Sequence, residues 1–176
     1  MLKCIICKNE QEAREVAKKV CVYGLSAAVC LVLGFLESLI PPVISVPGIK
    51  LGLANSASLI LIASGDVKGA LAVIFTRILL SALIFTAPFS LVFSLSGAAG
   101  SFVVMLLLSK THKFGITGLS IAGGTAHNIC QTAAAAAVLG KSVWYQLPVL
   151  LAGGAVSGAA VGLLTAFIFK RFYKKQ

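Results

Sequence analysis

The sequence predicts an all-α membrane protein with six transmembrane helices in one bundle and both termini in the cytoplasm. Composition gives the class, because 59% of the 176 residues are hydrophobic and only 11% are charged, whereas about a quarter of the residues of soluble domains are charged. Short basic clusters separate long apolar runs, which is the positive-inside pattern of proteins in a lipid bilayer. We therefore assign the net charge of +10 to cytoplasmic loops and expect no nucleic-acid partner.

The polar N-terminal segment comprises residues 1–19, and we expect it to be cytoplasmic. Its acidic start and the basic residues after it, Arg14, Lys18 and Lys19, predict a short amphipathic helix lying on the inner membrane face. The first span, Val20–Ile40, is about 31 Å long at 1.5 Å per residue, which is enough to cross a bilayer. It is too long for the apolar region of a signal peptide, and no small-residue cleavage site follows it.

The second apolar run, Leu51–Ser64, is only about 21 Å long as a helix, so both a re-entrant segment and a crossing are open. We favour a crossing, because residues 47–50 extend the run outward and the later loops then alternate between the two sides. The remaining spans are predicted at Gly69–Ala87, Phe89–Ser109, Ile116–Leu139 and Leu147–Phe169.

The orientation follows from the basic residues. With both termini inside, twelve of the fifteen Lys and Arg residues are cytoplasmic, Lys50 and Lys141 are outside, and Arg77 lies within the third span. The chain then divides into a cytoplasmic segment (1–19), a six-helix membrane domain (20–170) and a basic cytoplasmic tail (171–176). The five cysteines show no disulfide framework, and Cys4 and Cys7 form one CxxC with no second pair and no nearby histidine. Incidental cytoplasmic thiols are favoured there over a metal or redox site, so we predict no metal and no cofactor.

The segment 41–58 predicts a rigid lid and one wall of a pocket that opens outward. Three prolines stiffen it, and Gly48 permits a tight turn. Lys50 then stands alone at the head of the next apolar run, with Asn55 just over one helical turn further on. Glu37 lies at a similar depth near the outer end of the first span, where an ion pair with Lys50 and direct ligand contact are both open.

Arg77 is the most unusual residue of the membrane domain, because it lies near the middle of the third span. A central arginine costs a few kcal/mol on insertion, so it must face protein or water and have partners. Two roles are equally open, namely bonding backbone carbonyls to fix helices together and contacting a ligand directly.

The fifth span carries His127, Asn128 and Gln131 near mid-depth. Their i,i+4 and i,i+3 spacings place them on one helical face. A polar clamp between helices and a pocket wall are both consistent with this face. On the fourth span Ser96 lies one residue before Gly97, and its hydroxyl can bond its own helix backbone. The candidate ligand-binding residues are Glu37, Lys50, Asn55, Arg77, Ser96, His127, Asn128 and Gln131.

Small residues recur at helical spacing on two spans. Gly154, Gly158 and Gly162 on the sixth span predict close helix packing inside the bundle. Gly24 and Ala28 on the first span lie near the cytoplasm, where such a face suits a docking partner.

Four stretches together resemble the Gx transporter family, also labelled heptaprenyl diphosphate synthase component I. They are residues 37–42 with 47–55 (PGIKLGLAN), residues 77–83 (RILLSAL), residues 94–98 (SLSGA) leading to 104–105, and residues 126–131 (AHNICQ). The resemblance covers residues 20–170 in order.

The family is similar to the substrate-binding S components of energy-coupling factor (ECF) transporters in the bacterial plasma membrane, which are six-helix bundles with an outward pocket. It therefore implies a transmembrane coupling subunit with ATPases as partner, docked through Gly24 and Ala28.

The acidic residues show whether the chain could have the synthase activity that the family name suggests. Prenyl diphosphate synthases of the trans type bind magnesium pyrophosphate through aspartate-rich motifs, because hard cations need clustered carboxylates. This chain has one aspartate, Asp66, and three of its four glutamates lie in the N-terminal segment. We therefore predict no catalytic activity. Because His127 is the single histidine inside a span, one chain also cannot hold a haem by two histidines.

The sequence thus predicts a membrane substrate-binding protein for small-molecule uptake. Lys50 and Arg77 indicate a ligand with an anionic or polar head, and the apolar walls indicate an apolar or planar part. The alternative is a non-catalytic accessory subunit of prenyl diphosphate or quinone synthesis, or of extracellular electron transfer.

Overall fold

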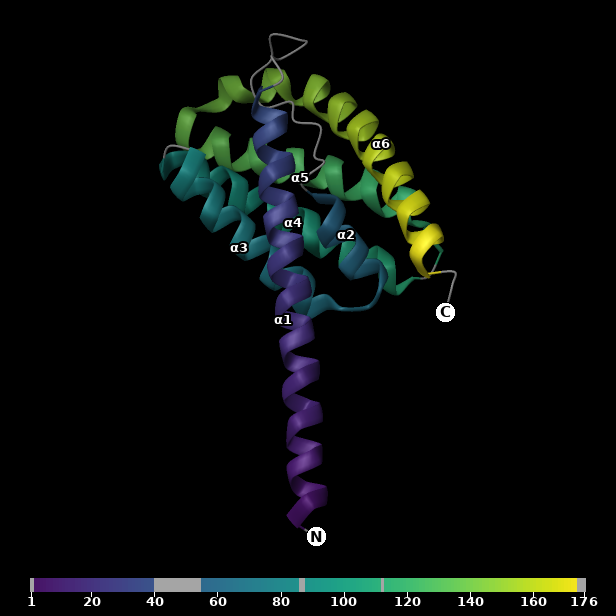
Figure 1. Cartoon of the computed structure of the whole chain (residues 1–176). Coiled ribbons are helices and arrows are strands. Elements are labelled where there is room, and N and C mark those ends of the chain that lie inside the picture. The colour runs from purple at the N-terminus through teal and green to yellow at the C-terminus, as the bar shows by residue number, and fades with distance from the viewer. Residues whose placement is uncertain (1, 40–54, 86–87, 112, 174–176) are drawn as a thin grey trace.

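A computed structural model describes residues 2–39, 55–85, 88–111 and 113–173 of the chain. These residues form a helical bundle without strands (Figure 1). The elements are α1 (Leu2–Leu39), α2 (Ser56–Ala63), α3 (Val67–Phe85), α4 (Pro88–Lys110), α5 (Ile116–Leu139), the 3-10 helix η2 (Lys141–Gln146) and α6 (Leu147–Tyr173). The predicted all-α class and the six α-helices are confirmed.

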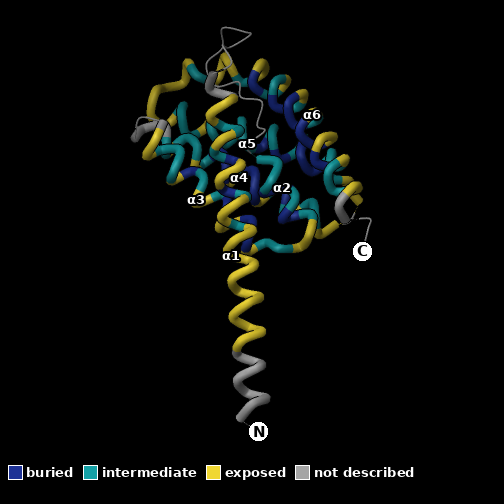
Figure 2. The backbone as a smooth tube through the Cα atoms, in the orientation of Figure 1, coloured by how far each residue is buried: buried dark blue, intermediate teal, exposed yellow. Residues whose placement is uncertain are grey.

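Helix α1 is one continuous helix of 38 residues, about 57 Å long at 1.5 Å per residue. Its C-terminal half lies against the bundle, whereas its N-terminal half projects away from the other helices (Figure 1). Residues 10–22 are all exposed (Figure 2). We expected a separate short helix on the membrane face, but neither Gly nor Pro interrupts residues 2–23, so the segment continues the transmembrane helix.

Four helical segments in the described part of the chain are long and apolar enough to cross a membrane: Glu10–Leu36, Val67–Ile84, Leu91–Lys110 and Lys141–Arg171. Helix α5 has 24 residues and is also long enough, but its polar side chains lower its hydropathy. Helix α2 has eight residues, about 12 Å, and does not cross by itself. The chain is therefore a membrane-type protein, while six crossings and cytoplasmic termini stay predictions.

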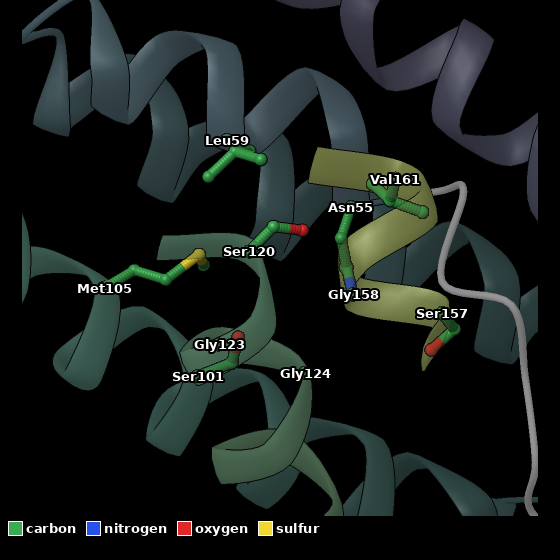
Figure 3. Close-up of a pocket in the computed structure, with 10 residues that line it drawn as sticks. All are labelled: Asn55, Leu59, Ser101, Met105, Ser120, Gly123, Gly124, Ser157, Gly158 and Val161. Carbon is green, nitrogen blue, oxygen red and sulfur yellow. The ribbon is translucent and has the colours of Figure 1, made fainter. Parts of the chain in front are cut away.

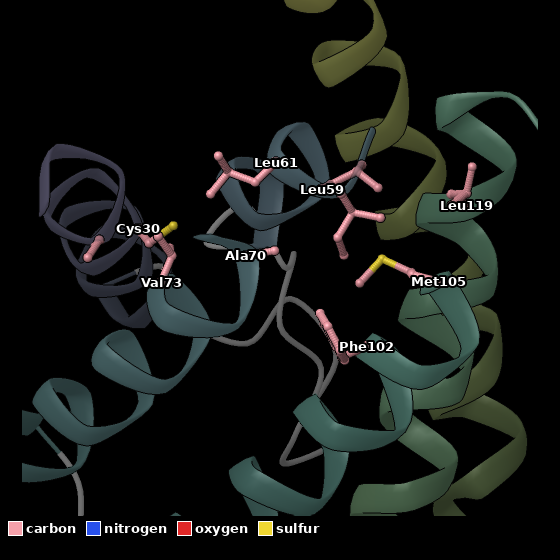
Figure 4. Close-up of a cluster of buried hydrophobic side chains, with 10 residues drawn as sticks. Cys30, Leu59, Leu61, Ala70, Val73, Phe102, Met105 and Leu119 are labelled. Atoms are coloured by element: carbon pink, nitrogen blue, oxygen red, sulfur yellow. The ribbon is translucent and has the colours of Figure 1, made fainter. Parts of the chain in front are cut away.

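Helix α2 lies at the centre of the bundle and contacts all five other α-helices. Helix α5 packs between α4 and α6, and α1 packs on α3. An eight-residue helix with apolar residues all round is stable only when other helices cover it, and Leu59, Leu61 and Ile62 of α2 are indeed buried. Figure 4 shows Leu59 facing Phe102 and Met105 of α4, with Cys30 and Val73 on the α1–α3 side of the same core.

Glycines bring the backbones of α5 and α6 into direct contact. A Cβ atom on Gly158 would lie 2.8 Å from the carbonyl oxygen of Ser120, and one on Gly124 would lie 2.8 Å from that of Gly154. A Cβ on Gly162 would lie 2.7 Å from Cα of Thr117. The prediction that the glycines of the sixth span serve packing inside the bundle is confirmed.

The turn between α2 and α3 is tied to α1 through Asp66. Gly65 adopts φ +82° in this turn, a conformation that favours glycine. One carboxylate oxygen of Asp66 accepts a hydrogen bond from the backbone N–H of Gly69 at 3.0 Å, and the other accepts one from the Tyr23 hydroxyl. The Tyr23 hydroxyl, followed by the Gly69 N–H, lowers the pKa of Asp66 below its ordinary value, and partial burial opposes this.

We expect Tyr23→Phe to destabilise the protein at neutral pH but not in acid. Because the folded-state pKa of Asp66 is lowered, its contribution to stability is present above its unfolded pKa of about 3.9 and is lost as the pH falls through the folded value. The unfolding temperature in detergent should therefore be lower for the variant at pH 7, and the difference should shrink toward pH 3. Tyr145→Phe is the control, because Tyr145 is 89% exposed. A Tyr23→Phe deficit that does not change with pH would contradict this account.

Candidate functional site

Arg77 and Asn55 form the polar contact that joins α3 to α2. The Nη1 atom of Arg77, from the middle of α3, donates a hydrogen bond of 2.8 Å to Oδ1 of Asn55, the residue that precedes α2. A guanidinium only donates, so its partner on Asn55 must be the amide oxygen. The Asn55 NH₂ group therefore points elsewhere. The structure brings these two predicted site residues together.

A cavity of about 30 Å³ lies next to Asn55, between the helices α2, α4, α5 and α6 (Figure 3). This volume has room for one or two water molecules. Its lining combines apolar side chains, glycines and hydroxyl groups: Asn55, Leu59, Ser101, Met105, Ser120, Gly123, Gly124, Ser157, Gly158 and Val161. Of the residues predicted for the ligand site, Asn55 lines this cavity.

Three of the lining residues, Ser101, Ser120 and Ser157, are not among those predicted from the sequence. Each lies within a long apolar helix and close in sequence to glycine. That combination is the sequence pattern that could have indicated the cavity, because a glycine on one helix leaves space beside a hydroxyl on the next. It is a weak signal, since serines in membrane helices commonly bond their own backbone. Ser157 does so, donating to the carbonyl oxygen of Gly154 at 3.3 Å.

The polar residues of α5 contact different neighbours. The Asn128 amide donates a hydrogen bond of 2.5 Å to the carbonyl oxygen of Leu150 on α6. The His127 ring instead packs on α4, where a Cβ atom on Gly97 would lie 2.8 Å from its Nε2. Gln131 is half-buried. The contact of Asn128 is a clamp between helices, and the cavity lining contains none of these three residues.

Ser96 bonds its own helix, as its position suggested. Its hydroxyl donates to the carbonyl oxygen of Phe93 at 2.9 Å and lies 3.4 Å from that of Cys130 on α5. These contacts satisfy the hydroxyl and connect α4 to α5.

The predicted roles of several residues are not tested by the described part of the structure. Lys50 and the side chain of Glu37 are outside the described residues, as is the lid at 41–50, so their roles stay predictions. Gly24 and Ala28 are exposed on α1, and a Cβ atom on Gly24 would meet nothing within 4 Å. Their proposed docking role also stays a prediction.

The family described as heptaprenyl diphosphate synthase component I matches residues 26–168. The chain belongs to this family. No curated protein and no solved structure matches it significantly. In this heptaprenyl diphosphate synthase component I protein, the single aspartate serves the contact between α1 and the α2–α3 turn. Within the described ranges, no group of three or more His, Cys, Asp or Glu side chains is placed to hold a metal ion.

Proposed function

We propose that this protein is a non-catalytic substrate-binding protein of the plasma membrane, similar to the S components of ECF transporters. The observation that carries the proposal is the Arg77–Asn55 hydrogen bond beside a cavity lined by four helices. A charged side chain within a transmembrane segment usually marks a functional site. Here Arg77 orients an amide toward a partly polar cavity, which is an arrangement suited to binding.

The lining indicates the chemistry of the ligand. Asn55 and the serine hydroxyls offer hydrogen bonds, and Arg77 adds positive charge behind Asn55. Leu59, Met105 and Val161 provide apolar walls. A ligand with an anionic or polar head and an apolar or planar part fits both features.

The bound state requires a wider cavity. Ligand pockets typically measure about 300–1,000 Å³, whereas this cavity measures about 30 Å³. Helix α2 contributes Asn55 and Leu59 to one wall, and the remaining walls belong to α4, α5 and α6. Movement of α2 away from these helices would enlarge the cavity, so the structure corresponds to a closed, ligand-free state in this proposal.

A binding role also agrees with the distribution of acidic residues. Magnesium pyrophosphate chemistry needs clustered carboxylates, and the one aspartate of the chain is engaged by Tyr23 and Gly69. The proposed partner is a transmembrane coupling subunit with its ATPases. The exposed Gly24–Ala28 face of α1 supports this choice, because small residues allow close approach of another helix.

We expect the purified protein to carry a small molecule with an acidic or polar head, detectable by mass spectrometry of the denatured sample. Asn55→Ala should lower its amount per protein about tenfold or more, since a hydrogen bond to a charged group is worth about 1.5–3 kcal/mol. Ser109→Ala is the control, because its hydroxyl bonds Leu106 outside the cavity. A wild-type preparation with no compound above the level of control membranes would refute the proposal.

The alternative function is an accessory subunit of prenyl diphosphate or quinone synthesis, or of extracellular electron transfer. The projecting half of α1 favours this alternative, since residues 10–22 are exposed and offer a helix to a soluble partner. Affinity purification from the native membrane separates the two functions. Loss of a soluble enzyme after deletion of residues 2–15, with no small molecule bound, would support the accessory role.

A further inference from the structure

Two hydroxyl groups in the cavity have no hydrogen-bond partner among the described residues. Ser101 on α4 is 5% exposed and Ser120 on α5 is 7% exposed, and both line the cavity. Figure 3 shows the Ser120 hydroxyl directed toward Asn55. Neither oxygen is among the described atoms that are fully buried without a hydrogen-bond partner, which include Thr165 Oγ1, so both serine hydroxyls face the open space of the cavity.

Several other hydroxyls in or next to the helices behave differently, although the buried Thr165 hydroxyl on α6 also has no hydrogen-bond partner among the described residues. Six of them donate to carbonyl oxygens three or four residues back on the same helix: Ser64, Ser96, Ser109, Thr111, Thr125 and Ser157. That contact is the normal solution for serine and threonine in an apolar helix. Ser101 and Ser120 do not make it, and their hydroxyls remain available to a molecule inside the cavity.

Asn55 completes a set of donors around this space. Its amide oxygen is occupied by Arg77, so the group it can offer to the cavity is its NH₂, which only donates. The Arg77 guanidinium lies behind this amide and carries a positive charge. The described part of the lining contains no carboxylate, and hard metal cations bind clustered carboxylates. The complementary occupant is an atom that accepts hydrogen bonds.

We propose that this cavity is the subsite for the carboxylate or carbonyl group of the ligand, with Asn55, Ser101 and Ser120 as its hydrogen-bond donors. This inference rests on the proposed binding function and specifies the group that the site recognises. A carboxylate end is small enough to enter a space of this size, about 30 Å³, before the cavity widens for the rest of the ligand. Water molecules fill the site when the ligand is absent.

Formate, the smallest carboxylate, is the probe for this subsite. The full-length protein in detergent is unfolded thermally in increasing sodium formate, with sodium gluconate at equal ionic strength as a reference anion that is too large to enter. We expect a saturable rise in unfolding temperature with formate, because a ligand that binds the folded state stabilises it. The double variant Ser101→Ala/Ser120→Ala should bind formate at least tenfold more weakly.

The unfolding temperature in gluconate shows whether the two serines bind the ligand or stabilise the fold. Because neither hydroxyl bonds another described residue, and water takes the place of the ligand in the empty site, the double variant should unfold at nearly the same temperature as the wild type. Ser109→Ala, on the same helix as Ser101, should keep the full formate response. A wild type without a formate response, an equal response in the double variant, or a double variant destabilised in gluconate would each overturn the subsite.

The outcomes for the function and for the subsite are separable. A copurified compound together with no formate response leaves the binding function standing and removes the subsite. A formate response that depends on the two serines, in a protein that carries no compound, supports the subsite and removes the uptake function.

Discussion

Gly158→Ala should destabilise the protein by about 1–3 kcal/mol, and Gly158→Leu should prevent accumulation of folded protein. The added Cβ atom would lie 2.8 Å from the carbonyl oxygen of Ser120 and 2.9 Å from Cα of Ile121. Both are backbone atoms, so no side chain can rotate away and the two helices must separate. Unfolding in a denaturing detergent, followed by circular dichroism, measures the change.

Gly24→Ala is the matched control for this substitution. Gly24 also lies within a helix, but a Cβ atom there meets nothing within 4 Å. Alanine is favoured over glycine inside a helix by about 1 kcal/mol, so stability should be equal or higher. If Gly158→Ala were as well tolerated as Gly24→Ala, the direct backbone contact between α5 and α6 would be wrong.

Arg77→Ala and Asn55→Ala should lose stability in a coupled manner. Each single variant removes the 2.8 Å hydrogen bond between α3 and α2, so the double variant should lose less than the sum. We expect a coupling free energy of about 1.5–3 kcal/mol, the range for a hydrogen bond to a charged group. Thermal or denaturant unfolding of the four proteins measures it.

The control cycle combines Arg77→Ala with Asn128→Ala. Asn128 bonds Leu150 on α6, and α3 has no substantial packing with α5 or α6 in the described structure. The two effects should therefore add to within about 0.5 kcal/mol. Equal coupling in both cycles would mean that Arg77 acts through the whole bundle and not through Asn55.

Much of the fold could be predicted because helix ends carry strong local signals. The predicted fifth span, residues 116–139, coincides with α5, since Gly115 and Gly140 flank it and Gly140 has φ +96°. The structure of the N-terminal segment was harder to predict. A charged segment before a membrane span is polar whether it lies on the membrane or continues the helix, and composition does not separate these cases.

The sequence identified several residues of the site but not how they contact one another. Arg77 and Asn55 were both selected, but their pairing depends on how α3 packs against α2, which no local pattern encodes. His127 and Asn128 were expected on one face. Adjacent helix positions are about 100° apart, however, so two neighbouring helices take one residue each. Ser101 and Ser120 were missed because the cavity that makes them unusual exists only once four helices have packed.

The uninterrupted α1 has a mechanical consequence. About 30 Å of its roughly 57 Å fits inside the hydrocarbon layer, which leaves an arm of about 27 Å beyond it. A stiff arm of this length turns small rotations into large displacements, so a change of about 20° in tilt, the average inclination of such helices, moves its tip by about 9 Å. Because Tyr23 fastens α1 to the α2–α3 turn, a shift of α2 around an occupied cavity would be amplified at the N-terminus. If α2 moves when the cavity is occupied, as the proposed function requires, α1 would carry that movement to its projecting N-terminal half.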